Sequence, residues 1–477
     1  MKGWVSLGLP RLSLRSRRLR VAALGVLATA GVLGLAERDA SASGYLAARF
    51  GADHGTPAIA NPYAVYYNPA AMGGAKGTTI TADGTFAYRW AQYNRGENGI
   101  SPSDPSYRDN PSYLQANTGT ATLHNVLATP FLGFMTDFGG TNFRLGAASY
   151  VPFGGSAEWD KKDGDPALPY TKDGVQRWQS ISGSILALYN TIAASYTIEP
   201  ADLTIGLNGS LVYHSIKTVR ARNADGTDDV TSASGRLVEG RSLVEATGLN
   251  FGAGIGLYWM PKHLAGYTMK DRLRIGVSYT SQPGFGQTRM KGTLDQVLST
   301  GKPGVDDIDF LQTYPDIIRA GFAHRFPGDK LELRGDGYFA RWSVFKRQCL
   351  VKRGADCPIN GDGTSDAGTP PGTDVIQNIE RNWKDAVGFR FGAAYFFDYP
   401  GFEVFGSGGF STPAAPKSTM DAATIDSQRI SGTIGIRKVL FDHLTLAGSY
   451  NHIFFLPVDT GDNNTRRGGT GLLRGGG

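Results

Sequence analysis

The chain has 477 residues and a formal net charge of +6. The first 42 residues carry seven Lys/Arg and two Asp/Glu, which leaves 41 basic and 40 acidic residues and a net charge of about +1 in the remainder. This near balance gives no support for nucleic-acid binding, so we expect no nucleic-acid partner. No stretch reads as a linker between two cores, and one large domain accounts for the length.

The first 42 residues are predicted to be a signal peptide. A basic stretch with five arginines between Arg11 and Arg20 precedes the apolar run Val21–Ala36, and Ala40-Ser41-Ala42 supplies a small-x-small cleavage pattern. The alternative is a membrane anchor, but sixteen residues rich in Ala and Gly are short for a spanning helix.

Residues 43–75 do not alternate and contain three prolines, so we assign them to a separate N-terminal segment that precedes a barrel formed by residues 76–477. In the barrel region, apolar residues alternate with small or polar ones. From Leu203 to Tyr213, for example, the apolar residues hold odd positions. This period of two predicts β-strands. Thirteen strands are expected, at 76–91, 121–138, 141–153, 176–199, 202–219, 243–260, 272–284, 313–326, 330–345, 382–398, 400–411, 429–440 and 443–456.

The connections separate a membrane barrel from a soluble sandwich, which alternates in the same way. Short and long connections alternate along the chain. The short ones are tight turns, such as Gly139-Gly140 and 327–329, and the long ones are polar loops, among them 220–241, 285–312 and the stretch after Trp342. Transmembrane barrels have short periplasmic turns and long surface loops, and only alternate residues of their strands face lipid. The sequence therefore predicts an all-β, transmembrane antiparallel β-barrel in the outer membrane of a Gram-negative bacterium, in contact with its lipid.

Such barrels usually have an even number of strands, so about fourteen are expected and the last one is missing or stunted. An open sheet edge inside a bilayer is costly. Either Thr470–Arg474 forms a short closing strand, or the chain is truncated or frameshifted at its C-terminus.

The only two cysteines, Cys349 and Cys357, lie in the long loop after Trp342. In an exported protein this spacing favours one disulfide that closes a short surface loop. A metal site is the alternative, but no histidine lies nearby, and we expect neither a metal nor a cofactor.

Several short stretches together resemble the FadL/TodX family of outer-membrane transporters. The mature start Ser43-Gly44-Tyr45 is followed by Asn68-Pro69-Ala70, and later stretches agree in order and spacing across nearly the whole mature chain. These later stretches are Tyr150-Val151-Pro152-Phe153-Gly154, Trp342-Ser343 and Asn382-Trp383-Lys384-Asp385.

The resemblance implies a fourteen-stranded barrel whose lumen is plugged by an N-terminal hatch, here residues 43–75 with the turn Asn68-Pro69-Ala70. It implies uptake of long-chain fatty acids or other hydrophobic small molecules, which are captured by extracellular loops and released sideways through the wall. The exit would lie beside a kinked third strand, where Tyr150, Pro152 and Phe153 are the candidates. The plain alternative is a strand that ends at Pro152.

The less apolar strand faces carry seven arginines. Arg319 and Arg390 fall nearest the middle of their strands and are the candidates for binding a substrate carboxylate. The alternative is a structural ladder with acids such as Glu332 and Asp336. The arginines are Arg144, Arg274, Arg319, Arg325, Arg334, Arg390 and Arg437.

Two other functions were weighed. A general diffusion porin is disfavoured because an open pore needs no plug, and because aromatic and aliphatic residues share the inner face. A barrel enzyme, such as a lipase or protease, is disfavoured because no nucleophile, base and orienting group fall on matching strand ends and no catalytic motif occurs. We expect a monomer without enzymatic activity.

Overall fold

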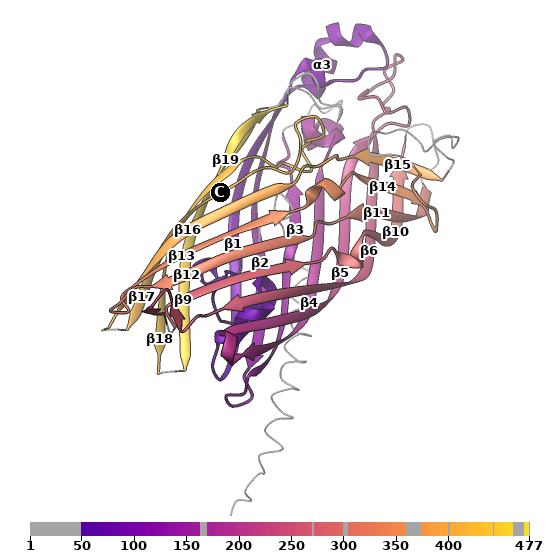
Figure 1. The fold of residues 1–477 in the computed structure, drawn as a ribbon. Coiled ribbons are helices and arrows are strands. Elements are labelled where there is room, and N and C mark those ends of the chain that lie inside the picture. The colour runs from indigo at the N-terminus through magenta and orange to yellow at the C-terminus, as the bar shows by residue number, and fades with distance from the viewer. Residues whose placement is uncertain are drawn as a thin grey trace, which may run out of the picture. The chain divides into compact units, whose positions relative to one another are not determined.

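The computed structural model describes residues 49–162, 169–269, 271–298, 304–358, 374–398, 401–441 and 443–460, and the backbone of 472–476. The expected signal peptide and residues 43–48 lie outside the described residues. The described chain forms one large antiparallel sheet that curls around an N-terminal segment (Figure 1).

The sheet begins with six long strands, each paired with the next. They are β1 (Thr78–Arg95), β2 (Gly119–Thr136), β3 (Phe143–Glu158), β4 (Ser182–Ile198), β5 (Leu203–Arg222) and β6 (Gly240–Trp259).

Each of the next four rows of the sheet is divided into two strands. These rows are β9 (Leu273–Thr280) with β10 (Gln287–Val297), β12 (Ile317–Arg325) with β11 (Gly304–Thr313), β13 (Leu331–Ala340) with β14 (Arg347–Lys352), and β16 (Ala386–Phe397) with β15 (Val375–Glu380). The sheet ends with β17 (Phe402–Ser411), β18 (Arg429–Leu440), β19 (Leu444–Asp459) and β20 (Leu472–Gly476).

The short strand β20 closes the sheet. It pairs with β19 on one side and with β1 on the other, so the described pairings run in a complete circuit. Six long rows, four divided rows and four single rows give fourteen rows in the described part of the chain. The prediction of an all-β antiparallel barrel of about fourteen strands is confirmed, and a short closing strand is the form that its C-terminal edge takes.

Two of the predicted long loops are wrong. Residues 285–312 contain β10 and β11, and the stretch after Trp342 contains β14 and β15. In β10, Met290 and Leu294 are buried, whereas Lys291 and Asp295 are exposed. Because the outward positions are charged rather than apolar, the strand lacks the greasy face by which the other strands were recognised.

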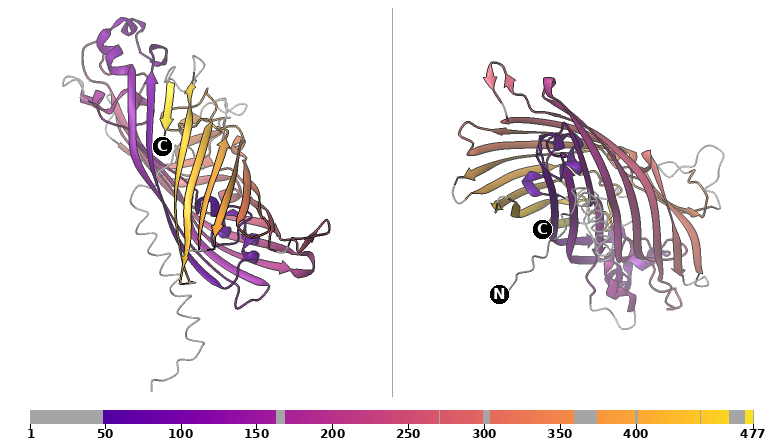
Figure 2. Two further views of the ribbon diagram at one scale, coloured as in Figure 1. Left: turned by 90° about the vertical axis from the view of Figure 1, so that its left-hand side faces the viewer. Right: turned by 90° about the horizontal axis from the view of Figure 1, so that it is seen from below.

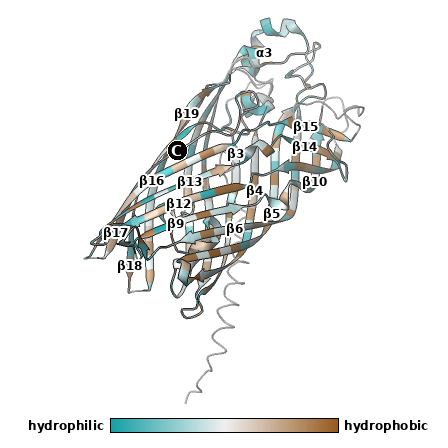
Figure 3. Cartoon of the chain, viewed as in Figure 1, coloured by the Kyte–Doolittle hydropathy of each residue, from teal (hydrophilic) through white to brown (hydrophobic). Residues whose placement is uncertain are grey.

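Along the other strands, apolar side chains point away from the lumen. In β5, Leu207 and Leu211 are exposed, whereas Thr204 and Ser210 are buried. Brown and teal residues alternate along the strands in the same way (Figure 3). An apolar outer surface on every second residue is the pattern that lipid requires of a barrel wall.

The N-terminal segment, residues 49–77, lies within the ring of strands (Figure 2). It contains η1 (Ala52–His54), α2 (Ala64–Tyr67) and η2 (Pro69–Gly74), and η2 contacts β3, β4, β5, β6 and β9. The segment lies towards the short-turn end of the barrel, which is defined by the turns at 137–142, 199–202 and 326–330; the opposite end is the loop end.

The loop end carries the remaining helices of the β1–β2 and β3–β4 connections. They are η3 (Glu97–Gly99), η4 (Pro105–Asp109), α3 (Pro111–Asn117), η5 (Pro169–Asp173) and η6 (Val175–Trp178). Single turns occur at η7 (Glu199–Ala201), η8 (Pro283–Phe285) and η9 (Trp342–Val344), and β7 (His263–Leu264) pairs with β8 (Tyr267–Thr268). None of the described helices is long and apolar enough to cross a membrane.

Candidate functional site

The turn Asn68-Pro69-Ala70 attaches the N-terminal segment to the wall. Asn68 is fully buried, and its Nδ2 donates hydrogen bonds to Pro57 O at 2.9 Å and to Leu257 O of β6 at 3.0 Å. Its Oδ1 accepts from Ala70 N at 3.1 Å and so caps η2. The asparagine thus binds the segment and the barrel with a single side chain.

Glycines in the facing strands allow this close approach. A Cβ atom at Gly206 would lie 2.2 Å from Ala70 N, and one at Gly256 would lie 1.9 Å from Asn68 Oδ1. A Cβ atom at Gly276 would lie 1.9 Å from Pro57 O. Nothing in the sequence indicated this role, because the alternation around Gly206 does not show which residue lies opposite it.

Arg390, one of the two predicted substrate arginines, is bound to the N-terminal segment. It is 4% exposed, and its guanidinium donates to Ala52 O at 2.8 Å and to Gly55 O at 3.0 Å. It also pairs with Asp53 at 3.3 Å and with Asp336 of β13 at 2.9 Å. These contacts occupy its donors in the described structure.

Arg319, the other candidate, has different surroundings. Its guanidinium lies 4.5 Å from the centre of the Tyr66 ring and donates to Thr280 Oγ1 at 3.0 Å. It is 5% exposed, and none of the described carboxylates forms an ion pair with it. The structure therefore separates the two arginines: Arg390 is paired with acids, and Arg319 is stacked on an aromatic ring.

Other lumen arginines form the expected ladder with acids. Glu332 binds Arg274, Arg325 and Arg334, and Arg334 continues to Glu403 at 2.7 Å. Glu403 also pairs with Arg437 at 3.2 Å.

The N-terminal segment joins this ladder through His54. Its Nε2 lies 3.0 Å from Glu403 Oε1, and burial lowers the pKa of the His54 imidazole.

The wall is interrupted between β2 and β3. Their ladder runs from Thr136–Leu145 to Phe131–Tyr150 and then stops, although both strands continue towards the loop end. On its other side, β3 shifts register against β4 between Tyr150 and Phe153. We call residues 125–130 and 151–158 the β2–β3 interval.

Two prolines stand where the ladder stops. Pro130 precedes Phe131 on β2, and Pro152 lies within the register shift of β3. Proline has no N–H to donate to a ladder. The sequence drew attention to Pro152, but Pro130 was missed because nothing in the sequence shows that the two prolines lie at the same break in the ladder.

Side chains bridge the interval instead of backbone pairs. Arg89 Nη2 donates to Ser156 O at 2.8 Å, and Asn125 Nδ2 donates to the same oxygen at 3.2 Å. Main-chain contact between the two segments resumes nearer the loop end, where Asp160 N donates a hydrogen bond to Thr122 O at 3.0 Å.

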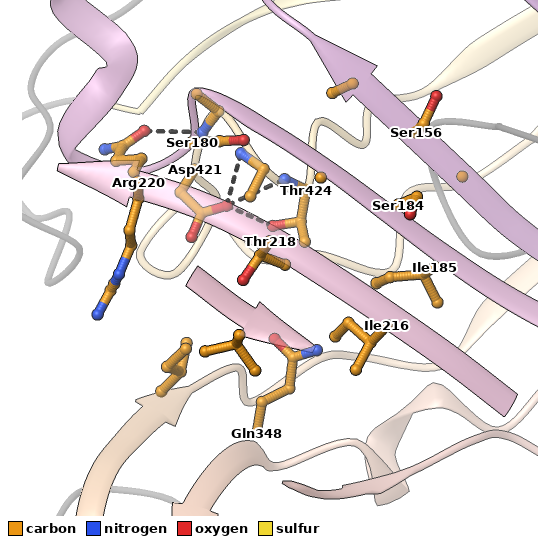
Figure 4. Close-up of a pocket in the computed structure, with 18 of the residues that line it drawn as sticks. Ser156, Ser180, Ser184, Ile185, Ile216, Thr218, Arg220, Gln348, Asp421 and Thr424 are labelled. Atoms are coloured by element: carbon orange, nitrogen blue, oxygen red, sulfur yellow. Dashed lines mark hydrogen bonds between the residues drawn. The ribbon is translucent and has the colours of Figure 1, made fainter. Parts of the chain in front are cut away.

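A cavity adjoins this interval at the loop end, with about 1080 Å³ of empty space including its open mouth. Gly154, Gly155, Ser156 and Ala157 of β3 line it, as does Arg89, so the cavity and the interval share residues. Apolar side chains from other strands and from the β17–β18 connection complete the lining, together with polar ones around Asp421 (Figure 4). The apolar members include Ile185, Ile216, Val244, Phe310, Leu350 and Ile425.

Aromatic side chains fill the lumen between the cavity and the N-terminal segment. Tyr150 stacks on Tyr189 with 5.6 Å between ring centres, and Phe153 contacts Tyr189, Tyr314 and Trp342 at 5.4–6.2 Å. All five are buried. Two of the three residues proposed for the kink, Tyr150 and Phe153, therefore belong to the packing of the lumen as well as to the wall.

Cys349 of β14 forms a disulfide with Cys357. Cys349 is fully buried beside Leu311 and Val351 near the loop end. No group of three or more His, Cys, Asp or Glu residues in the described part of the chain is arranged to hold a metal ion.

A closed antiparallel barrel with an apolar outer face and an occupied lumen defines an outer-membrane β-barrel. The family model described as outer membrane protein transport protein (OMPP1/FadL/TodX) matches residues 21–400, and the chain belongs to this family. The family consists of outer-membrane transporters of hydrophobic compounds in Gram-negative bacteria.

Solved structures show the same fold. A Pseudomonas aeruginosa FadL homologue is 17% identical with a TM-score of 0.66, and the match covers 91% of this chain and 96% of that one. The Pseudomonas putida toluene transporter TodX is 17% identical with a TM-score of 0.58, covering 91% and 95%. The Ralstonia pickettii toluene transporter TbuX is 14% identical with a TM-score of 0.53, covering 87% and 91%. A comparison with curated protein sequences gave no match.

Proposed function

We propose that this protein takes up hydrophobic compounds, such as fatty acids or hydrocarbons, and releases them sideways into the outer membrane through the β2–β3 interval. The observation that carries the proposal is the interrupted ladder beside the cavity, where the side chains of Asn125 on β2 and Arg89 on β1 bind β3 and backbone pairs are missing. Side-chain contacts can be exchanged without breaking a continuous ladder.

The path along the barrel axis is occupied. Residues 49–77 act as a hatch in this proposal, held to β6 through Asn68, to β16 through Arg390 and to β17 through His54. A greasy substrate also loses about 0.8 kcal/mol per CH₂ when it returns to water. Sideways release keeps it out of the periplasm. In this arrangement the loop end is extracellular, the short turns are periplasmic, and a monomer suffices because cavity and interval belong to one chain.

A reversible crosslink tests the route. Asn125→Cys combined with Ser156→Cys places two thiols across the interval, and oxidation should block uptake of a labelled hydrophobic compound in cells that lack other uptake systems. Reduction should restore it. Ala194→Cys combined with Leu207→Cys is the matched control, because these residues face each other in the continuous β4–β5 ladder.

The wild-type protein must be carried through the same oxidation and reduction, because its own disulfide also responds. Undiminished uptake by the oxidised Asn125/Ser156 variant, with crosslinking verified, would reject sideways release through this interval.

A further inference from the structure

His214 is a buried polar side chain without a hydrogen-bonding partner in the described part of the chain. It lies on the lumen face of β5, two residues from Ile216, which lines the cavity. The side chain is 0% exposed, and neither Nδ1 nor Nε2 has a partner among the described residues.

The ring belongs to the aromatic packing between the cavity and the N-terminal segment. It stacks on Tyr314 with 5.0 Å between ring centres and 27° between planes. Tyr314 in turn contacts Phe153, which lies at the register shift beside the β2–β3 interval. We call Phe153, Tyr189, His214, Tyr314 and Trp342 the aromatic constriction. It lies between the cavity and the N-terminal segment.

Three neighbouring hydroxyls on the same side of the lumen are paired. Tyr150 Oη and Thr191 Oγ1 lie 2.9 Å apart, and Thr191 Oγ1 and Ser210 Oγ lie 2.8 Å apart. Ser210 is four residues before His214 on the same face of β5. Leaving a buried imidazole unpaired beside a satisfied chain of hydroxyls lowers the stability of the fold, because buried polar groups are normally hydrogen-bonded.

We propose that His214 binds the hydroxyl group of an aromatic substrate of the phenol class where the aromatic constriction meets the cavity and the β2–β3 interval. The inference rests on the proposed function, since it names the substrate class that the same passage recognises. Flat aromatic rings of the lining suit offset or edge-to-face contact with an aromatic ligand.

A hydroxyl suits this imidazole better than a carboxylate or a hydrocarbon does. The neutral ring offers one N–H donor and one acceptor nitrogen, and which nitrogen carries the proton is open. A hydroxyl can accept from the donor or donate to the acceptor, so it satisfies either tautomer. A carboxylate can only accept, and a hydrocarbon can do neither.

The test compares 4-butylphenol with butylbenzene, which share the alkyl chain and ring. Binding to the full-length protein in detergent is measured by quenching of tryptophan fluorescence, with each affinity corrected for partition into empty micelles. The wild-type protein should prefer the phenol. In His214→Phe, which keeps a ring at the site, the preference should fall by about 2- to 10-fold, the range of one net hydrogen bond. His214→Gln should retain part of it, because the amide supplies a donor and an acceptor.

His263→Phe is the matched control, since His263 is exposed in the β7–β8 hairpin and should keep the wild-type preference. Equal affinity of the wild type for both compounds would overturn the proposal, and so would a preference that survives in His214→Phe. If neither compound binds the wild-type protein, the result rejects the proposed transport of such compounds, on which the role of His214 depends.

If His214→Phe does not assemble, the wild-type protein provides the test: the ¹⁵N signals of one labelled histidine should shift with 4-butylphenol and not with butylbenzene. Absence of such a shift at saturating phenol would refute the assignment.

Discussion

Asn68 and Leu257 are 189 positions apart in the sequence, yet the side chain of the first donates a hydrogen bond to the main-chain carbonyl of the second at 3.0 Å. The contact requires the segment to approach the wall closely, and Gly256 beside Leu257 leaves room for it. Gly256, an inward-facing position of β6, thus makes room for the N-terminal segment to dock on the wall.

Gly256→Ala should therefore weaken docking of the N-terminal segment. The new methyl group would overlap Asn68 Oδ1, and overpacking of this kind typically costs about 1–3 kcal/mol. Cleavage by trypsin after Lys76 should become faster, as followed by mass spectrometry. Gly432→Ala, which meets no atom within 4 Å, should cleave like the wild type. Equal protection of both variants would show that this contact does not limit docking.

Exchanging the two lumen arginines for methionine should give different results. Arg319→Met should weaken fatty-acid binding by about 10- to 150-fold, because a hydrogen bond to a charged group contributes roughly 1.5–3 kcal/mol, and should affect a neutral alkane little. Arg390→Met should instead release the N-terminal segment, because Arg390 binds Ala52 and Gly55. Calorimetry and the trypsin assay separate these effects. Equal losses of charged and neutral ligands in Arg319→Met would assign it a structural role.

Acid should weaken docking of the N-terminal segment through the protonation of buried His54. Burial lowers the pKa of His54, so the docked segment binds fewer protons than the undocked one. Docking is then strongest above the ordinary histidine pKa of about 6.5 and weakens as the pH falls from there towards the lowered value. Accessibility of Thr56→Cys to a thiol reagent, corrected for reagent reactivity, should rise between pH 7.5 and 5.5. In His54→Gln this pH dependence should be reduced, and its full persistence would exclude His54.

A second crosslink separates sideways from axial release. Asp53 Oδ1 accepts a hydrogen bond from Ser407 Oγ at 2.6 Å, so Asp53→Cys with Ser407→Cys can lock the N-terminal segment to β17. Release through the β2–β3 interval predicts that uptake continues in the oxidised variant. Loss of uptake on oxidation, with recovery on reduction, would favour a path past the segment.

Removing the disulfide should affect the loop end alone. In Cys349→Ser with Cys357→Ser, the small closed loop loses a constraint of about 2.5 kcal/mol on an entropic view. We expect faster proteolysis near Arg353 and unchanged protection of the N-terminal segment. On intact cells, a membrane-impermeant thiol reagent should label the wild type only after reduction. Labelling without reductant would contradict the bond, and labelling after reduction in broken cells but not in intact cells would place this end in the periplasm.

Strand positions were predictable because every second residue of a strand faces the lipid, and lipid favours apolar side chains there, as at Leu207 and Leu211. Where the wall carries charge outside, as at Lys291 in β10, that constraint is absent and the strands were missed. Alternation places a side chain on a face but does not name its partner. Arg319 and Arg390 therefore looked alike, and only the path of the N-terminal segment tells them apart.

The surroundings of His214 were equally hidden. The sequence shows only a histidine before a serine within β5, whereas the rings around it come from β3, β4 and the β11–β12 connection. Contacts between residues so far apart in the chain depend on the closure of the barrel and have no local pattern.

The four divided rows have a mechanical consequence. Their breaks, at 281–286, 314–316, 341–346 and 381–385, interrupt successive neighbours of the sheet, so β10, β11, β14 and β15 form a panel whose ladders are not continuous with those below. Each row of this panel is joined to the row below it by a short connection without ladder hydrogen bonds. Trp342, Phe345 and Trp383 pack together at two of these connections. Amide hydrogens of the panel should exchange as a unit of their own, ahead of the membrane-embedded rows beneath it.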